Sequence, residues 1–171
     1  MYYPSKDEFK RLSKKGNLIP VYRVIVADME TPVSAFKKIE GEYSYLLESV
    51  EGGEKLGRYS FLGSDPTLIV KCKGDKIEIV SKGRTTRIKG DPIKELKKIL
   101  SRYRSVKIKG LPRFHGGFVG YFSYDIVRHI EKLPDKNPDD LKLPDMQFLL
   151  DRKSTRLNSS HTRLSRMPSS A

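Results

Sequence analysis

Alternating apolar and polar residues in the middle of the chain predict three consecutive β-strands. Gly74-Asp75 and Lys82-Gly83 separate the three segments, and both pairs are typical of tight hairpin turns. The predicted strands are residues 67–73, 76–81 and 84–89. We therefore expect an antiparallel meander in this part of the chain.

Apolar residues at helical spacing predict a helix after Asp91-Pro92, with one buried stripe. The stripe is formed by Ile93, Leu96, Ile99, Leu100 and Tyr103. N-cap residues predict three more helices. One follows Ser5 and ends at Gly16, one follows Thr31 and runs from Pro32 to about Glu40, and one begins at Asp125.

Two further apolar regions complete the predicted sheets. Leu18 to Ala27 is dense in Val and Ile, which favour strands. Residues 45–63 hold two short apolar segments on either side of Gly52-Gly53, the pattern of a β-hairpin. Hairpins, a meander and separate helices alternate without a βαβ rhythm. The predicted fold class is therefore α+β, with mostly antiparallel sheets and outer helices.

Three glycines interrupt an apolar, aromatic strand pattern at Gly116, Gly117 and Gly120. A glycine inside a strand permits a bulge or the close approach of another backbone. Two alternatives explain these three glycines: tight packing of one strand on another, or a role in a functional site. They do not form a dinucleotide-binding fingerprint, because no G-x-G-x-x-G precedes a helix.

Polar side chains lie inside the apolar segments of the hairpin, at Glu48, Ser49, Arg58 and Ser60. Glu48 and Ser49 are adjacent, so on a strand they point to opposite faces of the sheet. In one interpretation Glu48 pairs with Arg58 across the ladder and Ser49 bonds a backbone group. In the other, these residues form the wall of a small-molecule pocket, where a ligand satisfies the polar groups.

Several motifs agree in order and spacing with one known family over residues 18–150. Leu46-Leu47-Glu48-Ser49 and Arg58-Tyr59-Ser60 resemble its hairpin signature, and residues 114–125 resemble its block F-x-G-G-x-V-G-Y-x-x-Y-D. Shorter similarities lie at residues 19–22, 28–32, 65–66, 131–134 and 143–145. The chain thus resembles the amino-terminal region of anthranilate synthase component I. That enzyme's large subunit converts chorismate to anthranilate in tryptophan biosynthesis.

The resemblance implies a regulatory and structural role. Ser49, Glu48 and Arg58 match positions that line half of a feedback site for the inhibitor L-tryptophan. The catalytic residues and the Mg²⁺ ion of the family belong to the carboxy-terminal chorismate-binding region. We therefore expect no catalytic or metal-binding residue here, and no anthranilate formation by this chain alone. The whole enzyme pairs with a glutamine amidotransferase, component II, that supplies ammonia.

Three alternatives stay open at this point. The first lies within the family and is the amino-terminal part of aminodeoxychorismate synthase component I, from the p-aminobenzoate pathway. The second is a free-standing effector-binding module. The third, from another class, is a basic domain that binds nucleic acid.

The composition changes at Asp151. Residues 151–171 contain six Ser and no aromatic residue, so they cannot bury much apolar surface. A nucleic-acid arm, a phosphorylation site and a non-native read-through segment are three interpretations of this tail, and we favour the third. The predicted organisation is one domain over residues 1–150, truncated relative to the family, followed by a disordered, non-native tail at 151–171.

The charge of the chain changes this picture little. The whole sequence has a net charge of +13, and residues 1–150, with 29 basic and 20 acidic residues, keep +9. The Lys residues alternate with Asp and Glu along turns and helices instead of forming one stripe with interleaved aromatic residues. We therefore expect a solvated basic surface, and nucleic-acid binding is disfavoured.

Cysteine and histidine usage sets further bounds. The single cysteine, Cys72, allows no intramolecular disulfide and fits the cytoplasm, and its place in an apolar strand favours packing. His115, His129 and His161 show no metal-ligand spacing. No apolar run reaches the ~20 residues that span a membrane, so no membrane partner is expected.

Overall fold

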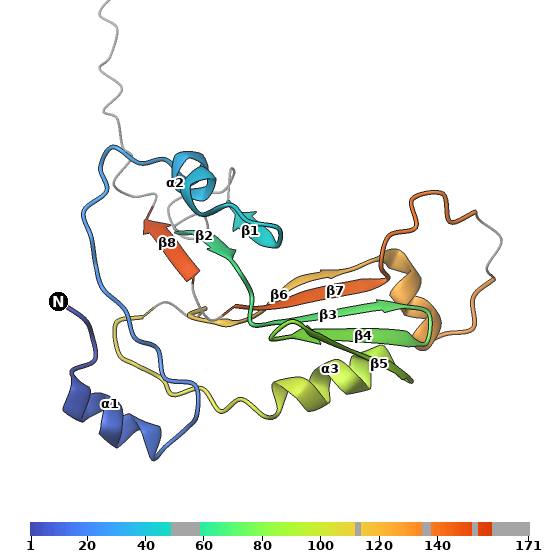
Figure 1. Cartoon of the computed structure of the whole chain (residues 1–171), viewed down its shortest axis with the longest axis horizontal. Coiled ribbons are helices and arrows are strands. Elements are labelled where there is room, and N and C mark those ends of the chain that lie inside the picture. The colour runs from blue at the N-terminus through green and yellow to red at the C-terminus, as the bar shows by residue number, and fades with distance from the viewer. Residues whose placement is uncertain (49–58, 112–113, 135–137, 152–153, 159–171) are drawn as a thin grey trace, which may run out of the picture. The chain divides into compact units, whose positions relative to one another are not determined.

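The structure of the chain is a computed structural model that describes residues 1–48, 59–111, 114–134, 138–151 and 154–158 (Figure 1). The chain divides into two compact units. Unit 1 comprises residues 1–24 and 66–152, and unit 2 comprises residues 25–65 and 153–171.

Unit 1 is built on a five-stranded antiparallel sheet with the strand order β5-β4-β3-β7-β6. The strands are β3 (Leu68–Lys73), β4 (Lys76–Ser81), β5 (Arg84–Lys89), β6 (Gly117–Phe122) and β7 (Met146–Asp151). The predicted meander is confirmed, since β3, β4 and β5 are neighbours joined by two-residue turns. The predicted α+β class with antiparallel sheets is confirmed as well.

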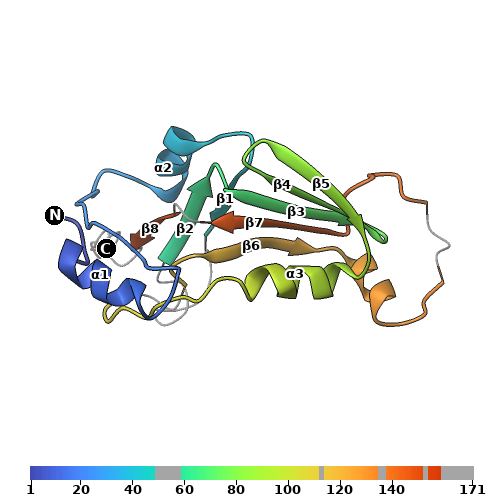
Figure 2. The same ribbon diagram turned by 60° about the horizontal axis from the view of Figure 1, so that its bottom comes forward.

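Helix α3 (Pro92–Leu100) lies along one face of this sheet (Figure 2). Its N-cap Asp91 accepts hydrogen bonds from the backbone amides of Ile93 and Lys94, at 2.9 and 3.1 Å. The core between helix and sheet holds the buried side chains of Val70, Cys72, Ile77, Ile99 and Met146. Because side chains alternate along a strand, the residues between these core positions lie on the opposite face of the sheet.

Two shorter helices belong to unit 1. At the start of α1 (Lys6–Ser13) the Ser5 hydroxyl accepts a hydrogen bond from the Glu8 amide at 3.3 Å, so Ser5 is the N-cap residue, as predicted. The helix predicted to begin at Asp125 is the 3₁₀ helix η1 (Tyr124–His129), and Ser123 occupies its N-cap position. Asp125 is not the cap, because its carboxylate pairs with Arg128 Nε at 3.0 Å. That part of the prediction is wrong.

The described part of unit 2 contains one helix and a three-stranded antiparallel sheet with the order β1-β2-β8. Its elements are α2 (Pro32–Ile39), β1 (Ser44–Leu47), β2 (Tyr59–Ser64) and β8 (Ser154–Asn158). Thr31 caps α2 as predicted and forms a reciprocal capping box with Ser34. The predicted pairing of two strands in the hairpin region is confirmed for β1 and β2.

Two predictions about irregular segments are corrected. Leu18–Ala27 is not a strand, since among the described residues only Leu18 and Tyr22 form isolated bridges there. Val and Ile favour extended backbone, but a strand also needs a neighbour to pair with. The tail is not structureless throughout, because Asp151 ends β7 and β8 pairs with β2. Such a segment can become ordered without an apolar core, because its backbone forms hydrogen bonds with an open strand edge.

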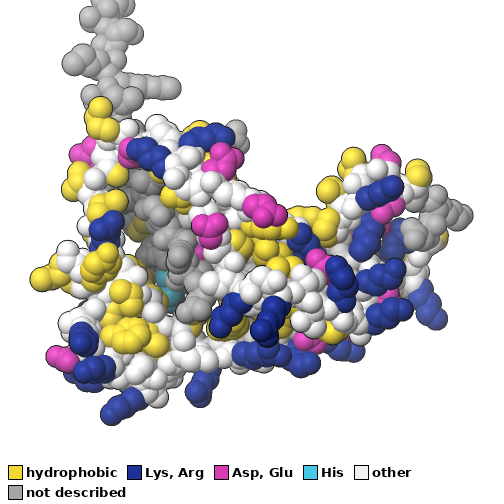
Figure 3. Space-filling model, in the orientation of Figure 1, with side chains coloured by type: hydrophobic (Ala, Val, Ile, Leu, Met, Phe, Trp, Pro, Cys, Tyr) yellow, Lys and Arg dark blue, Asp and Glu magenta, His cyan; other side chains and the backbone are white. Residues whose placement is uncertain are grey.

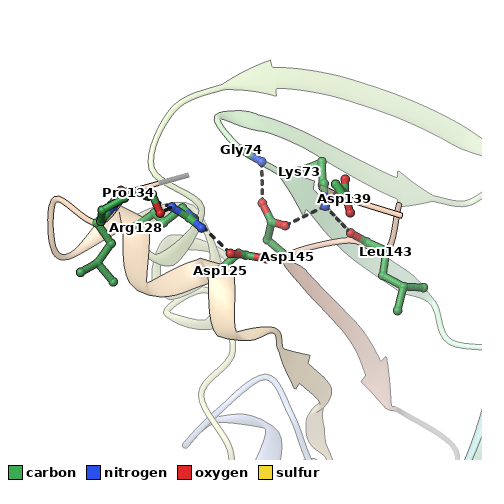
Figure 4. A network of polar contacts seen from close by, with 9 residues as sticks. Lys73, Gly74, Asp125, Arg128, Pro134, Asp139, Leu143 and Asp145 are labelled. Carbon is green, nitrogen blue, oxygen red and sulfur yellow. Dashed lines mark hydrogen bonds and ion pairs between the residues drawn. The ribbon is translucent and has the colours of Figure 1, made fainter. Parts of the chain in front are cut away.

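Asp145 joins the turn between β3 and β4 to the start of β7 (Figure 4). The residue is 6% exposed, and its Oδ2 accepts a hydrogen bond from the Gly74 amide at 2.7 Å. Its Oδ1 lies 3.2 Å from Lys73 Nζ, which also contacts Asp139 Oδ2 and the Leu143 carbonyl, both at 2.8 Å. These contacts raise the pKa of Lys73 and lower that of Asp139, each chiefly through the hydrogen bond between the two side chains.

The glycines of the aromatic strand have different structural roles. Gly116 and Gly117 have φ of 134° and 141°, a conformation that favours glycine. Gly120 lies in β6 against β7, and a Cβ there would meet the Gln147 carbonyl oxygen at 2.0 Å. The predicted close approach of two backbones is therefore confirmed at Gly120.

We expect Gly120→Ala to lower the free energy of unfolding by about 3 kcal/mol or more, because the added methyl meets rigid backbone. Gly41→Ala is the control, since its nearest neighbour is the Asp65 carboxylate oxygen at 3.2 Å, on a side chain that can move. Urea denaturation measures both. Equal losses for the two variants would contradict this account of Gly120.

We expect Asp145→Ala to cost about 1–3 kcal/mol, because it leaves the Gly74 amide without its acceptor. Asp145→Asn keeps an acceptor and should cost less. Asp139→Asn, which removes only a surface ion pair, should cost under about 1 kcal/mol. Urea denaturation near pH 7 separates the three variants, and an Asp145→Ala variant as stable as Asp139→Asn would refute the anchoring role.

Candidate functional site

In the sequence, the predicted effector residues fall between β1 and β2 of unit 2. Glu48 directly follows β1 and its side chain is exposed. Ser49 and Arg58 lie outside the described residues. The structure therefore fixes the position of one of the three predicted site residues. Both interpretations of the hairpin, the ion pair and the pocket wall, stay predictions.

The register of β1 on β2 defines the framework next to Glu48. Leu47 pairs with Phe61 and Leu46 with Leu62, which is fully buried. Ser60, on the same face of β2 as Leu62, is 3% exposed. Strand β2 therefore presents a buried hydroxyl one residue beyond Phe61, where its pairing with β1 ends.

A tyrosine and a glycine fix the packing on the other face of this pair. Tyr45 pairs with Gly63, and a Cβ on Gly63 would lie 2.7 Å from Cε1 of the Tyr45 ring. Gly63 thus has a steric reason, because the ring of Tyr45 occupies the space that a side chain at this position would need.

Helix α2 contacts both β1 and β2 and carries an ionic cluster at its start. Glu30 accepts hydrogen bonds from Lys38 Nζ and from the Ser34 hydroxyl, the latter at 2.8 Å. These two bonds, that of Lys38 first, lower the pKa of Glu30. The carboxylate precedes the helix N-terminus, where negative charge is favourable. The cluster therefore stabilises the helix that supports the hairpin.

Other residue types that carry chemistry show no assembled catalytic site in the described part of the chain. Burial, as the largest cause, raises the pKa of Cys72 to about 11, so the thiol is protonated and packs as a small apolar group. His115 Nε2 lies 3.1 Å from the Ser105 hydroxyl. Among the described residues no three His, Cys, Asp or Glu side chains could hold a metal ion.

The described residues therefore do not fit a magnesium site. No helix in the described part of the chain is long and apolar enough to cross a membrane.

The structure gathers basic residues where the sequence predicted a dispersed basic surface. A cavity of 570 Å³ in unit 1 is lined by six Lys and Arg residues and one acidic residue, Glu78. The cations are Lys71, Lys73, Lys76, Arg87, Lys89 and Lys142. Lys and Arg side chains also cluster near the β3–β4 turn in Figure 3. The register of the predicted meander was the signal that could have revealed this group.

Comparison with known proteins gives consistent relatives. No family model matches the sequence. Anthranilate synthase component 1 of Acetivibrio thermocellus is 44% identical over 151 residues, which cover 87% of this chain and 31% of that protein. The Aquifex aeolicus (strain VF5) protein of the same name is 39% identical over 149 residues, 85% of this chain and 30% of that protein.

A solved structure supports the fold. Anthranilate synthase component I from Streptococcus pneumoniae TIGR4 matches with a TM-score of 0.51 and 24% identity, over 81% of this chain and 29% of that chain. The chain thus spans under a third of the length of the relatives that it matches. Over most of its own length it belongs to the anthranilate synthase component I family.

Proposed function

We propose that this chain forms the amino-terminal, structural and regulatory region of an anthranilate synthase component I. The observation that carries the proposal is the 44% identity over 151 residues with the Acetivibrio thermocellus protein. In the proposed whole enzyme, chorismate and ammonia are converted to anthranilate in the cytoplasm. Component II, the glutamine amidotransferase, delivers the ammonia.

The region contributes a framework and not the reacting groups. The family's acid–base residues and its Mg²⁺ ion are expected on the remaining part of the enzyme. The described residues supply two antiparallel sheets and their helices instead. We therefore propose that the chain alone is inactive and that anthranilate forms only when the remaining part is present.

The proposed regulatory site lies at the open ends of β1 and β2 and binds L-tryptophan. Glu48 follows β1 directly, Ser49 is the next residue, and Arg58 immediately precedes Tyr59, the first residue of β2. A carboxylate and a hydroxyl accept hydrogen bonds from an ammonium group, and a guanidinium donates to a carboxylate. These three side chains therefore match the two charged ends of a free amino acid. The rest of the pocket is assigned to the remaining part of the enzyme.

A chimera tests the regulatory proposal. The 151 matched residues of the Acetivibrio thermocellus protein are replaced by their counterparts from this chain. We expect the chimera to form anthranilate and to be inhibited by L-tryptophan. Ser49→Ala and Glu48→Gln should each raise the inhibitory concentration about tenfold or more, since each removes a charge-assisted contact, and leave the uninhibited rate unchanged.

Glu42→Gln is the matched control for this experiment, because Glu42 is an exposed carboxylate just before β1. It should not change the inhibition. A folded chimera without activity would overturn the proposed function. An active chimera in which Ser49→Ala and Glu48→Gln keep full inhibition would overturn the effector site alone.

The isolated chain gives a complementary prediction. With chorismate, ammonia and Mg²⁺ it should form no anthranilate, and calorimetry should show no saturable heat with L-tryptophan, because half of the pocket is missing. Anthranilate formation or a stoichiometric tryptophan signal would refute the division of labour proposed here.

A further inference from the structure

The basic cavity of unit 1 contains lysines in a row across three adjacent strands. Lys73 pairs with Lys76 in the register of β3 on β4, and Lys76 pairs with Lys89 in the register of β4 on β5. All three lie on the sheet face opposite the core, because Cys72, Ile77 and Ile88 next to them point to the core. The next row on this face is Lys71, Glu78 and Arg87.

This arrangement places like charges directly opposite each other. Side chains at opposed positions of antiparallel strands have Cβ atoms about 4.5–5.5 Å apart, and like charges there are destabilising. A strand pair selected for stability alone would place an acidic residue at one of these positions. The next row does so, since Glu78 pairs with Arg87 Nε at 3.1 Å.

Neutralisation of the lysine row is incomplete. Asp139 and Asp145 contact Lys73, at 2.8 and 3.2 Å. Lys76, Lys89 and Lys142 are exposed, and the described part of the chain offers them no ion pair within 4.0 Å. Two lysines of the row, Lys76 and Lys89, therefore have no acidic partner within ion-pair distance in the described part of the chain.

We propose that this cavity binds a small oligophosphate, a ligand with two or more linked phosphate groups. Lysine is a compact point charge that binds phosphate oxygens well, and several separated lysines match several linked phosphates. A volume of 570 Å³ lies within the range of small-molecule sites. Among the described residues, the lining includes no aromatic side chain on which a nucleic-acid base could stack.

Isothermal calorimetry of the full chain with sodium tripolyphosphate tests the proposal. We expect saturable, one-to-one binding that weakens between about 50 and 200 mM salt, since the lysines are exposed and screened. The ligand should also raise the unfolding temperature, because it binds the folded sheet. Absence of saturable binding at the lower salt concentration would overturn the proposal.

Two double variants distinguish the cavity from general charge. Lys76→Gln/Lys89→Gln removes two members of the row, and Lys10→Gln/Lys97→Gln removes the same charge from exposed positions on α1 and α3. The first should weaken binding about tenfold or more and abolish the thermal shift, while the second changes affinity less than about twofold. Without ligand, the first variant should unfold at the same temperature as the parent chain or higher, since it removes repulsion.

Two results would contradict the cavity as an oligophosphate site. Equal weakening in both double variants would mean that only net charge attracts the anion. Tighter binding of a single-stranded oligonucleotide, lost in the same cavity variant, would assign the surface to nucleic acid. Neither result affects the proposed role in anthranilate synthesis, because no residue of the cavity belongs to the effector site.

Discussion

The pairing of β7 with β3 and β6 is the interaction on which unit 1 depends. β7 lies between β3, which ends at Lys73, and β6, which ends at Phe122. It therefore closes a sheet assembled from segments that are distant in the sequence. Asp145 starts this pairing: its amide donates to the Cys72 carbonyl and its carbonyl accepts the Ser123 amide, each at 2.8 Å. One residue before β7 thus connects both neighbouring strands.

The burial of apolar side chains follows from the position of β7 between β3 and β6. Met146 is fully buried in the same core cluster as Val70 and Ile99, and Phe148 packs edge-on against Phe118 and Phe122. The approach of β6 to β7 is close enough that residue 120 must be glycine. The aromatic packing and the bare backbone at Gly120 are two consequences of the same pairing, since Gly120 pairs directly with Phe148.

Local patterns were sufficient for the meander, the helices capped by Ser5, Thr31 and Asp91, and the fold class, because turns and caps are decided by neighbours in sequence. They were insufficient where a distant partner decides the structure. Val24, Ile25 and Val26 have strand-forming side chains, yet they are 79%, 63% and 86% exposed and outside any described strand. Conversely, the polar residues of β8 pair with β2 because an open strand edge accepts them.

The candidate sites show the same limit. Glu48 directly follows β1, and a sequence motif does not give the geometry of a binding pocket. The lysine row could be recognised only from the register of three strands, although each lysine was visible in the sequence. The chain thus combines a framework typical of its family with a charged surface. That surface can be recognised only from the register of the strands in this chain.

Hydrogen exchange with mass spectrometry tests the central claim, that β7 holds the sheet of unit 1 together. Amides of β3 and β7 should exchange most slowly, because opening them requires the sheet to unfold as a whole. The exposed segment 20–29 should exchange fastest among the described residues of the chain. Exchange of β7 as rapid as that segment, with β3 and β4 still protected, would contradict the account.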